Sequence, residues 1–281
     1  MIEIHFEEEV DAKTMYRQFS QCTNQAYNET YIYMENSTLV FHIPSAEYAY
    51  VEDVLIPALI HFILTVKEDK WIVSILRDSF YYEDAEERHH ILHIAHSILD
   101  GRRKGVLKQG IEEKREVFLA ASLREFVKDP VSFSFESYVK FRLKHYMSYL
   151  IRLTELAIDE YKLEQEYQAF VETLRQQVYK RKSRLSCLHL VFNGNFIFYD
   201  DKGARLNQDK LLHYLDCEVV SHQEVYIDTN VIAPLLSIAP KKICLYTTHT
   251  DHNMVITIQN VFQERVKVYS ICEFEKIRRD L

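Results

Sequence analysis

Histidines and carboxylates recur at helical spacing between residues 86 and 100. His89 and His93 lie four residues apart, so on a helix both imidazoles could hold one divalent metal ion, and a carboxylate could complete the ligand set. The whole polar face comprises Glu86, His89, His93, His96 and Asp100. Apolar residues occupy the opposite face, which is equally what a solvated amphipathic helix requires. A pH-sensitive contact is a third interpretation, because histidine titrates near neutrality.

A second histidine group follows a predicted strand at residues 243–247. The segment Thr247-Thr248-His249-Thr250-Asp251-His252 resembles the HxHxDH metal motif of metallo-β-lactamase-fold hydrolases. Thr247 stands where the first histidine of that motif belongs, and the glycines that follow the motif are absent. Ligands favour the carboxyl ends of parallel strands, so His249, Asp251 and His252 are candidate metal ligands. The alternative is a loop in which Thr250 and Asp251 cap the next helix.

Basic residues gather in two places that could bind phosphate. They are Lys140, Arg142 and Lys144 in one helical segment, and Arg102, Arg103 and Lys104 between two glycines. The glycine-flanked group could wrap a phosphate with backbone amides and cationic side chains. The helical group, with the basic residues of 175–184, could contact nucleic acid. The simpler interpretations are an interhelical connection and a basic helix end that suits the helix dipole.

Several classes of enzyme are disfavoured by what the chain lacks. It contains five glycines and no GxGxxG or GxxxxGK[ST] loop, GxSxG elbow or HExxH helix. No cofactor is therefore predicted, although the histidine groups could bind a divalent metal. The five cysteines are widely spaced without a CxxC pair, which is typical of reduced thiols and argues against a disulfide scaffold or a cysteine zinc site.

Charge and hydropathy indicate where the protein works. The net charge of −8 argues against nucleic acid as the main partner. The amino-terminal segment is acidic and alternating, unlike a signal peptide. The longest apolar run, residues 54–66, is shorter than the roughly 20 residues that span a bilayer, and is interpreted as a buried core helix. These observations predict a cytoplasmic protein without a membrane span.

The pattern of apolar residues predicts an α+β protein in two domains. Alternation at 2–6, 30–34 and 39–43, with an amphipathic helix at 11–22, predicts a small β-α-β-β unit. A predominantly helical body follows, in which Ser134 is expected to cap a long segment that is either two helices or one bent helix. The first domain is therefore predicted to span residues 1–184.

The remaining residues, 185–281, predict a C-terminal α/β domain. Two β runs flank Asn193-Gly194, which is a strong hairpin signal. Asp228 is expected to cap a helix that Pro240 stops. A strand at 243–247, a helix at 252–262 and a strand at 266–269 follow, and this order favours parallel pairing of the two strands.

Several segments also carry a resemblance to a known family. Residues 134–143, 157–161, 166–171, 238–243 and 262–266 together resemble the YtxC-like family of sporulation proteins from endospore-forming bacteria. The resemblance covers most of the chain from about residue 50 onward. It implies a cytoplasmic protein associated with sporulation, and it brings no catalytic residues with it.

The expected function is a non-enzymatic one, in which an exposed helical or aromatic surface binds another protein. Two alternatives remain open. The first is a metal-dependent hydrolase or phosphate-ligand enzyme centred on His249, Asp251 and His252. The second is a nucleic-acid-binding protein that uses Lys140, Arg142 and Lys144, whose affinity would fall steeply with salt. No sequence pattern indicates an oligomeric state.

Overall fold

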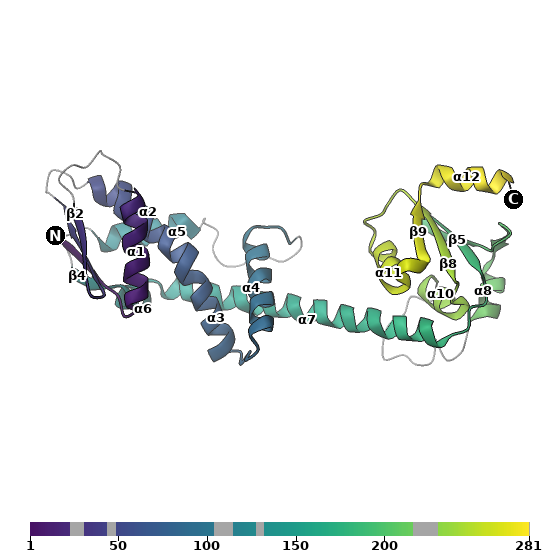
Figure 1. Cartoon of the computed structure of the whole chain (residues 1–281), viewed down its shortest axis with the longest axis horizontal. Helices are drawn as coiled ribbons and strands as arrows, with labels where there is room; N and C mark the ends of the chain where they lie inside the picture. Colours follow the sequence, from purple (N-terminus) through teal and green to yellow (C-terminus); the bar gives the residue numbers. More distant parts are fainter. Residues whose placement is uncertain (23–30, 44–48, 104–114, 128–131, 216–229, 281) are drawn as a thin grey trace. The chain divides into compact units, whose positions relative to one another are not determined.

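The computed structural model describes residues 1–22, 31–43, 49–103, 115–127, 132–215 and 230–280 (Figure 1). It is a mixed helix and sheet protein with one small sheet near each end of the chain, as the predicted α+β class requires. Contacts divide it into two compact units, Met1–Lys162 and Leu163–Leu281, called here the first and second units. The predicted boundary at 184/185 lies at the end of a long helix, whereas the contact division falls within that helix.

The first unit begins with a four-stranded sheet in the order β2-β3-β1-β4. Its strands are β1 (Ile2–His5), β2 (Tyr31–Glu35), β3 (Thr38–His42) and β4 (Ser132–Ser134). The first three strands confirm the predicted alternation, and α1 (Glu9–Cys22) packs on β2 and β3. Strand β4 pairs in parallel with β1 although about 130 residues separate them, so this sheet closes only when the helical body is in place.

Helices make up the rest of the first unit. Residues Val51–Asp78 are continuously helical. The π-helical turn η2 (Val51–Leu55) leads into α2 (Ile56–Phe62), and a second π-helical turn, η3 (Ile63–Lys67), joins α2 to α3 (Glu68–Asp78). The expected core helix is confirmed, because Leu59, Phe62 and Ile63 are fully buried. The others are α4 (Ala85–Leu99), α5 (Arg115–Phe126) and α6 (Phe135–Arg142).

The long segment after Ser134 consists of two helices. The Ser134 side chain accepts a hydrogen bond from the Ser137 amide, so it caps α6 as predicted. Leu143 separates α6 from α7, which runs from Lys144 to Lys180. Buried residues of α7 up to Tyr161 belong to the core of the first unit, and those from Val171 onward belong to the core of the second.

The second unit contains a five-stranded sheet in the order β7-β6-β5-β8-β9. Its strands are β5 (Cys187–Asn193), β6 (Asn195–Tyr199), β7 (Arg205–Leu206), β8 (Lys242–Thr247) and β9 (Val266–Tyr269). The β5–β6 hairpin turns at Gly194, and β5, β8 and β9 are parallel, so both strand predictions are confirmed.

Helices pack against this sheet within the second unit (Figure 1). They are α8 (Gln208–Tyr214), α10 (Ile232–Ile238), α11 (Asn253–Phe262), which a 3-10 turn η4 (Gln263–Arg265) extends, and α12 (Ile271–Asp280). The predicted cap Asp228 lies outside the described residues. Ala239 adopts a left-handed conformation directly after α10, and Pro240 follows it. None of the described helices combines the length and the apolar character needed to cross a membrane.

Candidate functional site

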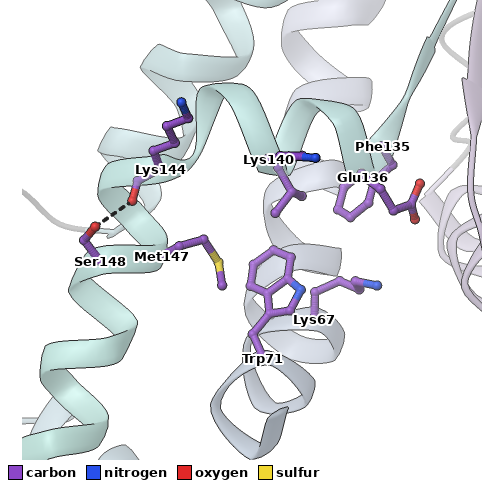
Figure 2. Close-up of a pocket in the computed structure, with 9 residues that line it drawn as sticks. Lys67, Trp71, Phe135, Glu136, Lys140, Lys144, Met147 and Ser148 are labelled. Carbon is purple, nitrogen blue, oxygen red and sulfur yellow. Dashed lines mark hydrogen bonds between the residues drawn. The ribbon is translucent and has the colours of Figure 1, made fainter. Parts of the chain in front are cut away.

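A pocket of about 500 Å³ lies in the first unit where α6 and the start of α7 face the end of η3 and the start of α3 (Figure 2). We call it the lysine–tryptophan pocket. Its lining residues are Lys67, Trp71, Phe135, Glu136, Val139, Lys140, Lys144, Met147 and Ser148. Figure 2 shows Trp71 extending from one helix toward Met147 on the opposite side. The pocket thus joins an apolar floor to several ammonium groups.

The local sequence explains how the lining is assembled. Ser134 starts α6, and the break at Leu143 ends it, so that Lys140 and Lys144 stand on either side of the break. Lys67 and Trp71 are four residues apart on the facing helix and therefore project from the same side of it. Leu143 itself is fully buried and anchors the junction in the core.

The three lysines of the pocket differ in how their charge is compensated. The Lys67 ammonium donates to Asp11 Oδ2 at 2.7 Å, and it also lies over the Phe135 ring, 5.7 Å from its centre. Lys140 and Lys144 are exposed and form no ion pair with any residue that the structure describes, although the Lys140 ammonium lies 5.8 Å from the centre of the neighbouring Phe141 ring. These two ammonium groups are the charges that an incoming anion would meet.

One carboxylate also lines the pocket. Ser134 Oγ donates to Glu136 Oε2 at 3.3 Å, and this carboxylate lies in the first turn of α6, where the helix dipole favours a negative charge. With Lys67 neutralised by Asp11, the remaining lining charges are two lysines and one glutamate. The lining is therefore weakly positive in a chain whose net charge is −8.

Of the basic residues predicted from the sequence to bind phosphate or nucleic acid, two line the pocket. Lys140 and Lys144 line it, whereas the Arg142 guanidinium lies over the Phe126 ring at 5.9 Å. Arg102 pairs with Asp100 at 2.5 Å and Arg103 with Glu160 at 2.9 Å, while Lys104 lies outside the described residues. Sequence reasoning missed Lys67, Trp71 and Met147; the Lys67–Trp71 spacing and the uniqueness of Trp71 were the available signals.

The predicted histidine face lies on α4, whose amino terminus Asp84 caps. Glu86, His89 and His93 line a surface hollow together with Ala85 and His90. His96 is engaged elsewhere, because its Nε2 lies 2.9 Å from Asp69 Oδ1. One of the three imidazoles of this face is therefore in close contact with a carboxylate of α3.

One of the two histidines after β8, His252, has a structural role at the start of α11. His252 caps α11, since its Nδ1 accepts a hydrogen bond from the Met254 amide at 3.2 Å. Its ring also packs on Phe192, with the ring centres 4.6 Å apart. The expectation that Thr250 or Asp251 would cap this helix is wrong: the imidazole at the next position supplies the acceptor. The His249 amide donates to Thr247 Oγ1 at 2.9 Å.

A different set of donors converges in the second unit. In the described part of the chain, the group of three metal-ligand side chains whose donor atoms all lie within 4.8 Å of one another is Cys187, His189 and Cys244, on β5 and β8. Neither histidine group predicted from the sequence forms such a set among the described residues.

Comparison with known proteins places the chain in context. The model of the YtxC-like family matches residues 53–267. The chain is 33% identical over 275 residues to the uncharacterized protein YtxC of Bacillus subtilis (strain 168), an alignment that covers 98% of this chain and 96% of that protein. No solved structure matches it.

Proposed function

Because the chain belongs to the YtxC-like family, we propose that it is a cytoplasmic, sporulation-associated protein that binds another protein and does not catalyse a reaction. The lysine–tryptophan pocket is the proposed binding site. The single observation that carries this proposal is that two exposed ammonium groups outside any ion pair, Lys140 and Lys144, lie beside the apolar surface of Trp71 and Met147.

The proposed ligand is an acidic segment of a partner protein that carries one aromatic or aliphatic side chain. Aromatic rings and methionine thioethers adapt to apolar side chains of several shapes, as partner-binding surfaces require. The two lysines would orient the segment through its carboxylates and speed the encounter. A cavity of about 500 Å³ has the volume of a small-ligand pocket and can hold one large side chain with its flanking backbone.

Nucleic acid fits this pocket less well. Tight binding to a phosphate backbone needs many basic contacts. This pocket offers two lysines outside ion pairs, and the protein as a whole has a net charge of −8, which repels nucleic acid. We therefore expect no retardation of DNA or RNA by the protein even at low salt.

The test compares two matched double charge reversals. Lys140→Glu/Lys144→Glu alters the pocket, and Lys202→Glu/Lys210→Glu makes the same charge change at two exposed lysines of the second unit. Proteins captured from sporulating cells on each variant are compared with those captured on the wild type. A partner lost only from the Lys140/Lys144 variant supports the proposal; capture that is unchanged, or lost equally from both variants, refutes it.

Intrinsic fluorescence provides a direct reading of the same site. Trp71 is the one tryptophan of the chain, so a segment that enters the pocket changes the whole tryptophan signal. Synthetic acidic peptides with a central phenylalanine, taken from the sequence of the captured partner, should titrate this signal to saturation. Weakening of about tenfold or more in Lys140→Glu/Lys144→Glu is expected, and an unchanged affinity would remove the pocket from consideration.

A further inference from the structure

The parallel pairing of β5 with β8 brings two cysteines and a histidine together. His189 lies opposite Cys244 in the register, and Cys187 lies opposite Lys242. Cys187 and His189 are two residues apart on β5, so both project from the same face of the sheet as Cys244. Cys187 and Cys244 are 57 positions apart in the chain, and only the fold makes them neighbours.

The three donor atoms lie within 4.8 Å of one another, and two of their three separations are close to those of a tetrahedral metal site. Cys187 Sγ lies 3.8 Å from Cys244 Sγ and 3.9 Å from His189 Nε2. With Zn–S bonds near 2.3 Å and Zn–N bonds near 2.0 Å, tetrahedral angles place two sulfurs about 3.8 Å apart and a sulfur and a nitrogen about 3.5 Å apart. Both cysteines are free thiols, so the spacing is not that of a disulfide.

A further contact orients the imidazole. His189 Nδ1 lies 2.9 Å from the hydroxyl of Tyr246, which is fully buried, and the two rings stack with their centres 5.8 Å apart. When Nδ1–H donates to this oxygen, the lone pair of Nε2 is left facing Cys187. Metal-binding histidines commonly donate their other ring nitrogen in this way, which sets both the tautomer and the ring angle.

From this geometry we propose that Cys187, His189 and Cys244 form a zinc site that links β5 to β8 in the second unit. This site lies apart from the lysine–tryptophan pocket and from both histidine groups that the sequence indicated. Two thiolates and one imidazole are a soft donor set that suits Zn²⁺ better than Mg²⁺ or Ca²⁺. Three protein donors leave a fourth position for a water molecule.

The protonation of His189 agrees with a ligand role, whereas the Cys187 thiol must lose its proton to bind a metal ion. Burial, reinforced by nearby Lys242, lowers the pKa of His189, so the imidazole is neutral and able to ligate at neutral pH. Burial and the adjacent Cys244 thiol raise the pKa of Cys187 to about 11. A redox-active cysteine would need the opposite shift. Zinc must therefore displace the proton of the Cys187 thiol, and its affinity rises with pH.

The surroundings exclude most of the solvent. This face of the sheet carries Val191, Tyr199 and Tyr246, and Phe274 of α12 packs over it. Cys244 is buried and Cys187 is partly exposed, so an ion can reach the cluster from the Cys187 side. A further free cysteine, Cys272, is exposed on α12 and serves as an internal control.

The test begins with reduced, chelator-treated protein titrated with zinc chloride. Native mass spectrometry and competition with a chromophoric chelator should show one equivalent bound. Cys187→Ser and Cys244→Ser should weaken binding by at least 100-fold, Tyr246→Phe by about tenfold, and Cys272→Ser not at all. His249→Ala and His252→Ala should also leave the affinity unchanged. A wild type that binds no zinc, or a loss no larger in Cys187→Ser than in Cys272→Ser, overturns the proposal.

A measurement on the unaltered protein removes the risk that a variant misfolds. Reduced protein is alkylated with and without zinc, and the modified thiols are mapped by peptide mass spectrometry. Zinc should protect Cys187 by tenfold or more and leave Cys272 equally reactive. Equal reactivity of Cys187 in both conditions contradicts the site.

Discussion

The two units treat their buried polar groups in opposite ways. In the first unit, buried carboxylates face cations: Asp11 accepts from Lys67 and Lys70, both at 2.7 Å, and Glu68 accepts from Arg115 and from the Tyr146 hydroxyl. In the second unit, two thiols and an imidazole face one another. In the first unit the charges of the buried carboxylates are neutralised by side chains of the protein itself. The donor atoms of the second unit would instead need a bound cation, which is the zinc ion proposed above.

The Glu68 cluster also shows that burying a carboxylate carries a desolvation cost even when it has partners. Burial raises the pKa of Glu68 above its usual value even though Arg115 and Tyr146 favour the ionised form. Such a pair adds little net stability over an apolar replacement, but removal of one partner leaves the other charge stranded. The first unit should therefore be sensitive to single substitutions at these carboxylates, and the second unit to the supply of metal.

The largest expected effect is that of Glu68→Ala. It leaves the Arg115 charge and the Tyr146 hydroxyl without their partner and should lower the free energy of unfolding of the first unit by about 3 to 5 kcal/mol. Urea unfolding followed by Trp71 fluorescence measures it, because the one tryptophan lies in this unit.

The control for this substitution is Glu52→Ala. Glu52 pairs with Arg124 at 2.8 Å, but both side chains are about half exposed, so the change should stay within about 0.5 kcal/mol. Equal losses in the two variants would show that the buried cluster behaves as a surface pair.

Zinc should have the next largest effect, and only on the second unit. A free zinc concentration one hundred times the Kd adds about 2.7 kcal/mol to the unit that binds it. Hydrogen exchange of peptides from β5 and β8 should slow accordingly, while the urea midpoint from Trp71 fluorescence stays constant. A shift of the Trp71 transition with zinc would contradict the assignment of the site to the second unit.

Local rules in the sequence predicted most of the elements on both sides of this comparison. Alternation indicated β1 to β3, Asn193-Gly194 indicated the hairpin, and Ser134 indicated the start of α6. Each of these signals spans a few residues and depends on backbone preferences alone. Strand β4 escaped because its three residues are too few to establish a period, and its partner β1 is distant in the chain.

The sites were harder to predict because both depend on tertiary register. Cys187 and Cys244 carry no CxxC spacing, and a slip of one residue between β5 and β8 would send Cys244 to the opposite face. Lys140 and Lys144 were identified as basic residues, but their apolar counterpart Trp71 lies on another helix. Spacing in the sequence can identify ligand residues that lie on the same helix or strand. It cannot identify a site whose residues come from two different elements.

The third prediction concerns the pH dependence of the Asp11 cluster. Burial alone would raise the pKa of Asp11, but hydrogen bonds and charge from Lys67 and Lys70 outweigh it and lower that pKa. The stabilisation is therefore fully present above the unfolded pKa, about 3.9, and is lost as pH falls through the lower folded value. Asp11→Asn should cost about 2 kcal/mol at pH 7, and this difference from wild type should shrink below about pH 4.

Urea midpoints of wild type and Asp11→Asn across pH 3 to 7, read from Trp71, test this sign. Asp78→Asn is the matched control, because Asp78 and its partner Arg77 are both exposed. A gap between wild type and Asp11→Asn that widens toward low pH would reverse the assigned direction of the shift.

The smallest expected effect tests whether the fold of the second unit can be weakened without touching its donors. Gly194 has φ +80°, and a Cβ added there meets no atom within 4 Å, so Gly194→Ala costs only the strain of a left-handed conformation, about 1 kcal/mol. Hydrogen exchange across β5 and β6 should speed up by about fivefold, while the zinc stoichiometry stays at one. If Gly194→Ala abolished zinc binding as Cys187→Ser is expected to do, loss of metal would report on the folding of the hairpin and not on the removal of a ligand.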